Sequence, residues 1–116
     1  MLAAELSPML ATLNTVVANP NAPDLTMRQL VLLMSLANLS GNERWGVKEA
    51  AEKMNVSKPA ITRASDRLTV LELLMRKKHP MDRRQVVLMP TPKGLAYLRT
   101  LARNFNRAGK TSKEAA

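Results

Sequence analysis

Two groups of hydrogen-bonding side chains follow one another in the second half of the sequence, and both suit binding to an anionic partner. Hydroxyl groups bind phosphate oxygens, and an arginine can donate two parallel hydrogen bonds to the edge of a guanine. A protruding basic loop can also place an arginine in the minor groove of DNA. The first group is Ser57, Lys58, Thr62, Arg63 and Arg67, and the second is Arg76, Lys77, Lys78, Arg83 and Arg84.

The charge of the chain is concentrated around these two groups. The whole chain carries 18 Lys and Arg against 9 Asp and Glu, a net charge of +9. Residues 1–57 have a net charge of −1, whereas residues 58–110 contain thirteen basic and three acidic side chains, a net charge of +10. Such a localised basic excess is typical of a nucleic-acid-binding surface. The alternative is a basic surface that serves only solubility.

The other reactive residues do not form a catalytic or metal site. The chain has no cysteine, which excludes disulfides and thiolate ligands. His79 is its only histidine, and we interpret it as a loop residue or a phosphate contact. We find no nucleophile–base pair and no phosphate-cradling glycine loop, so we predict no enzymatic activity, cofactor or metal. With no signal-peptide pattern and no long apolar run, we expect no membrane association and a cytoplasmic, nucleoid-associated protein.

Helical periodicity predicts two helices ahead of the basic groups. The first covers residues 6–18, or begins earlier, and Pro20 limits its end. The second begins at a capping box formed by Thr26 and Gln29 and ends near Asn38. Its predicted inward stripe is Met27, Leu30, Val31, Leu33, Met34 and Ala37.

A helix-turn-helix arrangement is predicted to position the first group. A short helix over Val47–Met54 ends at Asn55, a residue type that tolerates the left-handed conformation at a helix end. Ser57 then caps a second helix, and Pro59 is tolerated in its first turn. In such a pair, the second helix enters the major groove with its N-terminus first. The alternative is an ordinary pair of helices with a solvated polar face.

A β-hairpin is predicted to position the second group. Its strands are residues 74–78 and 85–89, and its loop is residues 79–84. A last helix runs from Thr91 to about Gly109. The predicted inward residues of that helix are Leu95, Leu98, Leu101, Ala102 and Phe105.

Together these elements predict a mainly α protein with a small β-hairpin, an α+β winged helix-turn-helix of about five helices and a two-stranded wing. We expect a single domain over residues 1–109, with its motif core at residues 25–95. Residues 110–116 are expected to form a flexible basic tail.

Several short motifs occur in the order found in one family. Over residues 24–95, about 70 of 116 residues, the chain resembles the multiple-antibiotic-resistance-regulator (MarR) family of bacterial transcription factors. The matching motifs are Leu25-Thr26-x-x-Gln29, Val47-Lys48-Glu49-Ala50-Ala51, Val56-Ser57-Lys58-Pro59-Ala60-Ile61-Thr62-Arg63, Asp66-Arg67-Leu68, Asp82-Arg83-Arg84 and Thr91-x-Lys93-Gly94.

The resemblance implies a double-stranded DNA partner and a homodimer, formed through the terminal helices, on a pseudo-palindromic operator. It also implies a minor-groove arginine at the wing tip, Arg83 or Arg84, with Asp82 bracing a nearby arginine rather than touching DNA. A carboxylate can hold a guanidinium in one geometry, although Asp82 could equally be a simple turn residue. The implied base contacts are Ser57, Lys58, Pro59, Ala60, Thr62 and Arg63.

The chain departs from the family pattern in two places. Glu72 stands after the recognition helix, where the family usually has glycine, and a positive φ at this position would cost about 1 kcal/mol relative to glycine. The terminal helices are expected to be short, roughly a dozen and fifteen residues. With few aromatic residues, nothing marks an effector pocket, so a small-molecule effector stays unknown.

The sequence therefore predicts a sequence-specific DNA-binding transcriptional regulator, a homodimeric repressor that acts by occluding its operator. Two other functions remain open. One is a winged-helix interaction module whose basic surface meets an acidic protein. The other is an architectural or replication-associated DNA binder with little sequence preference.

Overall fold

The computed structural model describes residues 1–115, with side chains through residue 107, and it divides into two compact units. One unit is residues 25–95, and the other combines residues 1–24 with residues 96–116. Chain length alone predicts one domain over residues 1–109. The division arises because residues from the two ends of the chain pack together as a unit of their own.

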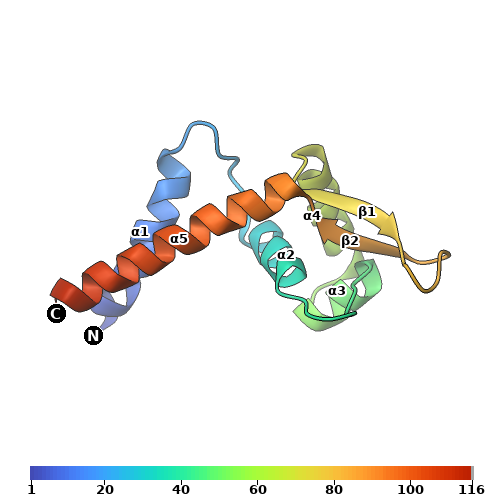
Figure 1. The fold of residues 1–116 in the computed structure, drawn as a ribbon, viewed down its shortest axis with the longest axis horizontal. Coiled ribbons are helices and arrows are strands. Elements are labelled where there is room, and N and C mark those ends of the chain that lie inside the picture. Colours follow the sequence, from blue (N-terminus) through green and yellow to red (C-terminus); the bar gives the residue numbers. More distant parts are fainter. Residues whose placement is uncertain (116) are drawn as a thin grey trace. The chain divides into compact units, whose positions relative to one another are not determined.

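The unit of residues 25–95 contains three helices followed by a two-stranded antiparallel sheet (Figure 1). The strands pair in a continuous register from Leu74 opposite Pro90 to Lys78 opposite Val86. This order confirms the predicted helix-turn-helix followed by a wing. The elements are α2 (Met27–Ala37), α3 (Val47–Met54), α4 (Lys58–Val70), β1 (Leu74–Lys78), β2 (Val86–Pro90) and the first turn of α5 (Pro92–Ala115).

The core of this unit lies where α2 meets α4 and β2. Helix α2 contributes leucines, α4 contributes the inward side of its helix, and the sheet contributes both strands. Each fully buried leucine or isoleucine stabilises the fold by about 1.5–3 kcal/mol. The buried apolar residues include Leu32, Leu33, Leu36, Ile61, Leu68, Leu73, Leu74, Val87 and Leu88.

The predicted inward stripe of α2 is largely wrong. Leu33 is buried as expected, but Met27 is 75% exposed and Val31 and Met34 are also exposed. Eight of the eleven residues of α2 are apolar. A helix with apolar residues on most sides offers several overlapping stripes, and periodicity cannot choose among them. The packing against α4 and β2 selects the face that carries Leu32 and Leu36 instead.

The second unit contains α1 (Leu2–Ala18) and the rest of α5. The two helices are joined by a hydrogen bond of 2.9 Å from Asn104 Nδ2 to Thr15 Oγ1. With 17 and 24 residues, both helices exceed the expected lengths. Helix α5 continues to Ala115 because Gly109 is accommodated within the helix rather than ending it. Residue 116 of the predicted tail lies outside the described residues.

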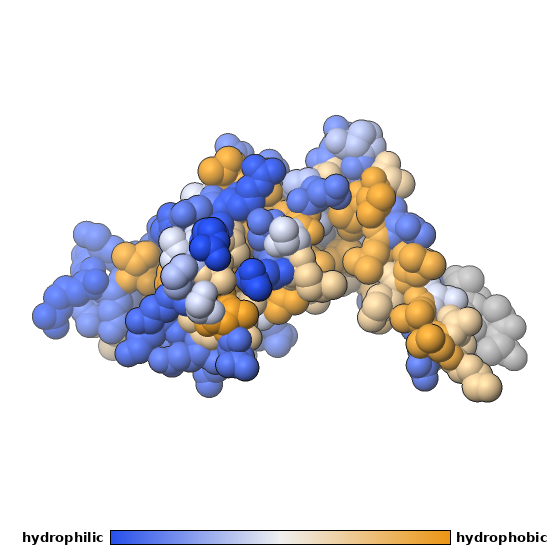
Figure 2. All heavy atoms as spheres, turned by 180° about the vertical axis from the view of Figure 1, so that it is seen from behind, coloured by the Kyte–Doolittle hydropathy of each residue, from blue (hydrophilic) through white to orange (hydrophobic). Residues whose placement is uncertain are grey.

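Apolar side chains of this unit are exposed along α1. Figure 2 shows hydrophobic atoms gathered over these helices. The prediction that Ala102 and Phe105 face inward is wrong, since Ala102 is exposed and Phe105 is 50% exposed. In residues 1–115, no helix has the length and apolar character needed to cross a membrane. The exposed large apolar residues of α1 are Leu2, Leu6, Met9, Leu10, Leu13 and Val17.

Helix α4 ends in a left-handed residue that is not glycine. Glu72 has a φ of 63°. Its N–H donates to the carbonyl of Thr69 at 2.9 Å, and the N–H of Leu73 donates to the carbonyl of Leu68 at 2.9 Å. These two bonds form a Schellman motif. A Cβ in this conformation costs about 1 kcal/mol relative to glycine, so the departure from the family pattern carries a cost in stability.

We predict that Glu72→Gly increases the free energy of unfolding by about 0.5–1 kcal/mol, because glycine adopts the left-handed conformation without the clash of Cβ. Urea denaturation of the two proteins measures the difference. Glu72→Ala is the matched control, since it removes the carboxylate that lies 3.9 Å from Lys93 Nζ but keeps Cβ. Equal stabilisation by both variants would show that the left-handed backbone is not the cause.

Candidate nucleic-acid interface

The turn between α3 and α4 is fixed by local hydrogen bonds. Asn55 has a φ of 58°, the left-handed conformation predicted for it. The N–H of Val56 donates to the carbonyl of Ala51 at 3.0 Å, which closes the end of α3. Ser57 then caps α4, with its Oγ accepting from the N–H of Ala60 at 3.2 Å. The chain therefore leaves α3 and enters α4 within a few residues, as a helix-turn-helix requires.

The start of α4 presents an exposed polar face. Residues at helical spacing point away from the core, and the only carboxylate among them is Asp66. Ala60 does not belong to this face, because it is 6% exposed and lies in line with the buried Ala64 and Leu68. The structure thus removes Ala60 from the predicted contact surface. The exposed residues are Ser57, Lys58, Pro59, Thr62, Arg63, Asp66 and Arg67.

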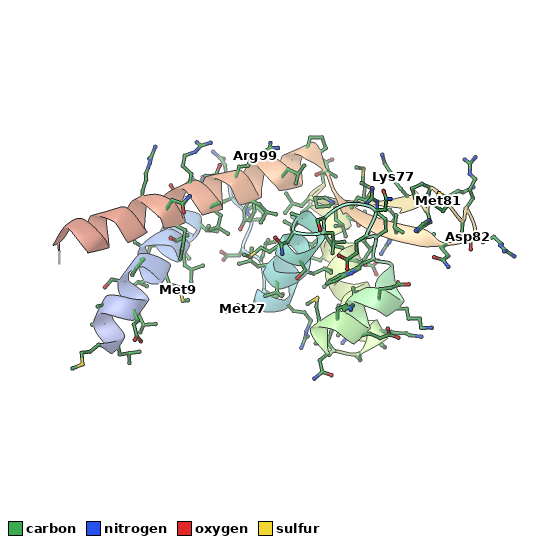
Figure 3. The ribbon with its side chains drawn as sticks, turned by 60° about the horizontal axis from the view of Figure 1, so that its bottom comes forward. Met9, Met27, Lys77, Met81, Asp82 and Arg99 are labelled. Carbon is green, nitrogen blue, oxygen red and sulfur yellow. The ribbon has the colours of Figure 1, made fainter. Side chains whose placement is uncertain are left out.

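The loop between β1 and β2 is closed by backbone bonds and organised by Asp82. The N–H of His79 donates to the carbonyl of Gln85 at 2.8 Å. Asp82 Oδ1 accepts from the backbone N–H of Arg84 at 3.1 Å and lies 3.4 Å from its Nε. The side chain of Arg84 is nevertheless 93% exposed. Met81 and Asp82 lie at the far end of this loop, so its arginines are carried away from the sheet (Figure 3).

His79 has a structural role in this loop. Its Nδ1 accepts a hydrogen bond of 3.0 Å from the N–H of Met81. Within the described part of the chain, no group of three or more histidine or carboxylate side chains is placed to hold a metal ion. His79 also lines an open depression of about 500 Å³ between the start of α3 and the wing, together with Arg44 and Lys48. The lining also includes Glu49, so the depression between the wing and α3 carries both basic and acidic side chains.

Arg76, a predicted DNA contact, is exposed on β1 and also contacts α4. Its Nη2 donates to Ser65 Oγ at 2.9 Å and pairs with Asp66 Oδ1, both on α4. The side chains of Arg76 and Asp66 are 38% and 58% exposed, so the ion pair is worth less than about 1 kcal/mol of stability. From the sequence, Asp66 is named as part of a family motif, and this pairing is not predicted. The one feature of the sequence that could have indicated the pairing is that Asp66 is the single carboxylate among the basic side chains of this face.

The far edge of the wing is attached to α3. The N–H of Leu88 in β2 donates to the carbonyl of Trp45 at 2.8 Å. Gly46, the N-cap of α3, lies so close to this strand that a Cβ would sit 2.7 Å from the carbonyl oxygen of Val86. A residue with a side chain would push the strand away. The need for glycine here was not predicted from the sequence.

The polar start of α4 and the basic loop both belong to the unit of residues 25–95, and Arg76 links β1 to α4. The predicted contacts of the wing are all exposed, as are the α4 residues named above; those of the wing are Arg76, Lys77, Lys78, Arg83 and Arg84. An exposed helix N-terminus beside a basic hairpin can place hydrogen-bond donors against phosphates and base edges at the same time.

Structures of other proteins share this fold. RV1404 from Mycobacterium tuberculosis superposes with a TM-score of 0.80 at 23% identity, over 99% of this chain and 74% of that chain. S. aureus MepR bound to ethidium bromide has a TM-score of 0.76 at 16% identity, over 97% of this chain and 81% of that chain. The PcaV transcriptional regulator from Streptomyces coelicolor has a TM-score of 0.63 at 21% identity, over 99% and 79%.

Comparison of the sequence with known families identifies the family of this chain. No curated protein shows a significant match to the whole chain. The pattern that defines the MarR family, however, matches residues 25–86, which contain α2, both motif helices, β1 and the wing loop. Because this match covers more than half of the chain and the fold agrees with it, the chain belongs to the MarR family of DNA-binding transcriptional regulators.

Proposed function

We propose that this protein binds a specific sequence of double-stranded DNA as a homodimer and represses transcription by occluding its operator. The observation that carries the proposal is the exposed polar start of α4 beside the exposed basic loop of the wing, within one compact unit. We refer to α4 as the recognition helix, and to β1, β2 and the loop between them as the wing.

The recognition helix suits the major groove. An α-helix with its side chains is about 10–12 Å wide, and the major groove of B-DNA is about 12 Å wide. The hydroxyls of Ser57 and Thr62 suit phosphate and base acceptors, and Arg63 suits the O6 and N7 of a guanine. Lys58 and Arg67 lie on the same exposed face and suit the flanking phosphates. Pro59, also exposed, offers an apolar contact.

The wing suits the minor groove and the backbone beside it. A narrow minor groove attracts an inserted arginine because its potential is strongly negative. Arg84 is held by Asp82 at its base yet exposed over most of its side chain, which fits such an insertion. Arg83 lies next to it, and Lys77 and Lys78 on β1 suit contacts to phosphates.

The terminal helices suit dimerisation. Six large apolar residues are exposed along the 17-residue α1, and soluble monomers rarely leave so many side by side. A second copy is the natural occupant, because a two-fold dimer brings two recognition helices to the two halves of a palindrome. A dimer bound in this way covers its operator, which is the basis of the proposed repression.

Selection of bound duplexes from a random pool tests the proposal. We expect a palindromic consensus with half-sites about one helical turn apart, bound at least ~10³-fold more tightly than bulk DNA. A steep salt dependence without a consensus would instead indicate architectural binding. A protein that binds no DNA at all would refute the proposal and favour an acidic protein partner.

Two arginines are expected to behave differently. Arg63→Ala should weaken binding by about 1–3 kcal/mol and relax the preference at one base position. Arg84→Ala should weaken binding more evenly across sequences, because a minor-groove arginine senses groove width more than base identity. Competition titrations against a set of single-base variants of the selected site separate the two effects.

Arg28→Ala is the control for the loss of one positive charge, since Arg28 lies at the start of α2, outside the proposed surface. The affinity of the Arg28→Ala protein for the selected DNA site should stay close to that of the wild type. If Arg63→Ala changed neither affinity nor base preference, the proposed orientation of the recognition helix would be wrong.

Dimerisation has its own test. Leu10→Glu should weaken self-association at least ~10-fold, because it replaces the apolar contact of an exposed leucine with a charge that must be buried. Sedimentation equilibrium measures the monomer–dimer constant. Val70→Glu introduces the same charge at an exposed apolar site in the other unit and should leave that constant unchanged. Equal effects of the two substitutions would argue against α1 as the interface.

A further inference from the structure

We propose that Arg76 is a positioning residue, which holds the wing against the recognition helix so that both reach the same duplex together. This inference rests on the DNA-binding function proposed above. It assigns to Arg76 a contact inside the protein in place of the direct DNA contact that the sequence predicts.

The contacts of Arg76 direct its guanidinium toward the recognition helix. Its Nη2 donates to the hydroxyl of Ser65 at 2.9 Å and also pairs with Asp66. Ser65 is fully buried, and its own hydroxyl donates to the carbonyl of Thr62 at 3.1 Å. The oxygen of Ser65 can therefore serve Arg76 as an acceptor. A guanidinium bound to this hydroxyl is directed toward α4, although 38% of the side chain stays exposed.

Strand geometry separates Arg76 from its basic neighbour. Successive side chains of a strand leave it on opposite faces, so Arg76 and Lys77 point in opposite directions from β1. Lys77 is exposed and carries its charge outward. The basic run at the end of β1 thus contains Arg76, which binds α4, and Lys77 on the opposite face, which is available to phosphates.

Asp66 gains a function from this arrangement. It lies on the exposed face of the recognition helix between Arg63 and Arg67, where an unpaired carboxylate would repel phosphates. Pairing with Arg76 offsets that repulsion and joins the helix to β1 at a point beyond the turn at Glu72. Both groups suit a bridge between two elements better than they suit a contact with DNA.

The bridge completes the attachment of the wing. The bond from Leu88 to Trp45 holds β2 to the segment before α3, and Arg76 holds β1 to α4. With both links, each strand of the wing is held to one part of the helix-turn-helix motif. Loss of the Arg76 link leaves the wing held only by the turn at Glu72 and the bond to Trp45, so the position of the loop arginines relative to the recognition helix is less strictly defined.

Asp66→Asn is the sharpest test, because charge and positioning predict opposite signs. Removal of a negative charge from a DNA-binding face should tighten binding if charge alone matters. If Arg76 is a positioning residue, we expect Asp66→Asn to weaken binding to the selected site at least ~5-fold. Tighter binding, with a steeper salt dependence as the released Arg76 takes up a phosphate, would overturn the inference.

Arg76→Gln and the neighbouring Lys77→Gln form a matched pair. Each loss of a phosphate contact reduces the slope of log K against log salt by about 1. We expect this reduction for Lys77→Gln in the wild type. In the Arg76→Gln protein, whose wing is no longer held to the recognition helix, Lys77→Gln should change the slope less than it does in the wild type. An equal reduction in both backgrounds would show that Arg76 does not position the wing.

A double-mutant cycle separates positioning from general destabilisation. In the wild type, Arg84→Ala removes the wing contact and lowers affinity. In the Arg76→Gln protein, which loses the guanidinium contacts to both Ser65 and Asp66, we expect Arg84→Ala to change affinity less than ~2-fold. Additive losses would contradict the inference. If the wild type itself showed no DNA binding, the proposed function would fail instead, and the two failures are therefore distinct.

Discussion

The burial of α2 against α4 and β2 is the constraint on which the DNA-binding unit depends. Leu32 and Leu33 are completely removed from solvent, and they contribute the largest side chains on the α2 side of the core. Helix α4 can cover these leucines only with the face that carries Ile61 and Leu68. Its opposite face is then left exposed, and that face carries the hydroxyl and basic side chains. The side of α4 that is buried in the core therefore determines which side chains remain exposed for binding.

Rigidity is the second requirement of the proposed binding mode, in which one rigid body meets two grooves. The recognition helix is capped by Ser57 at its start and ended by a Schellman motif at Glu72, so both of its ends are defined. The wing is connected at one end through that motif and along its far edge through Trp45. A left-handed glutamate in place of glycine indicates that the conformation of this connection is retained at some cost in stability.

Local features could be predicted from the sequence, whereas contacts between distant elements could not. The capping box at Thr26, the left-handed Asn55 and the cap at Ser57 depend on a few neighbouring residues, and the structure confirms each of them. The buried face of α2 and the end of α5 depend on packing and helix continuation, which periodicity alone leaves open. The bond from Arg76 to Ser65 joins residues on different elements, and no local pattern indicates which residue of a basic run contacts a neighbouring helix.

The attachment of the wing to α3 has a spectroscopic consequence. Trp45 is the only tryptophan of the chain, and its carbonyl accepts the bond from β2 while its indole Nε1 lies 3.3 Å from Glu43 Oε2. All tryptophan emission from this protein therefore originates at the junction of the wing and the helix-turn-helix. The protein carries a natural fluorophore at this junction, and its wavelength and lifetime can follow wing displacement without an added label.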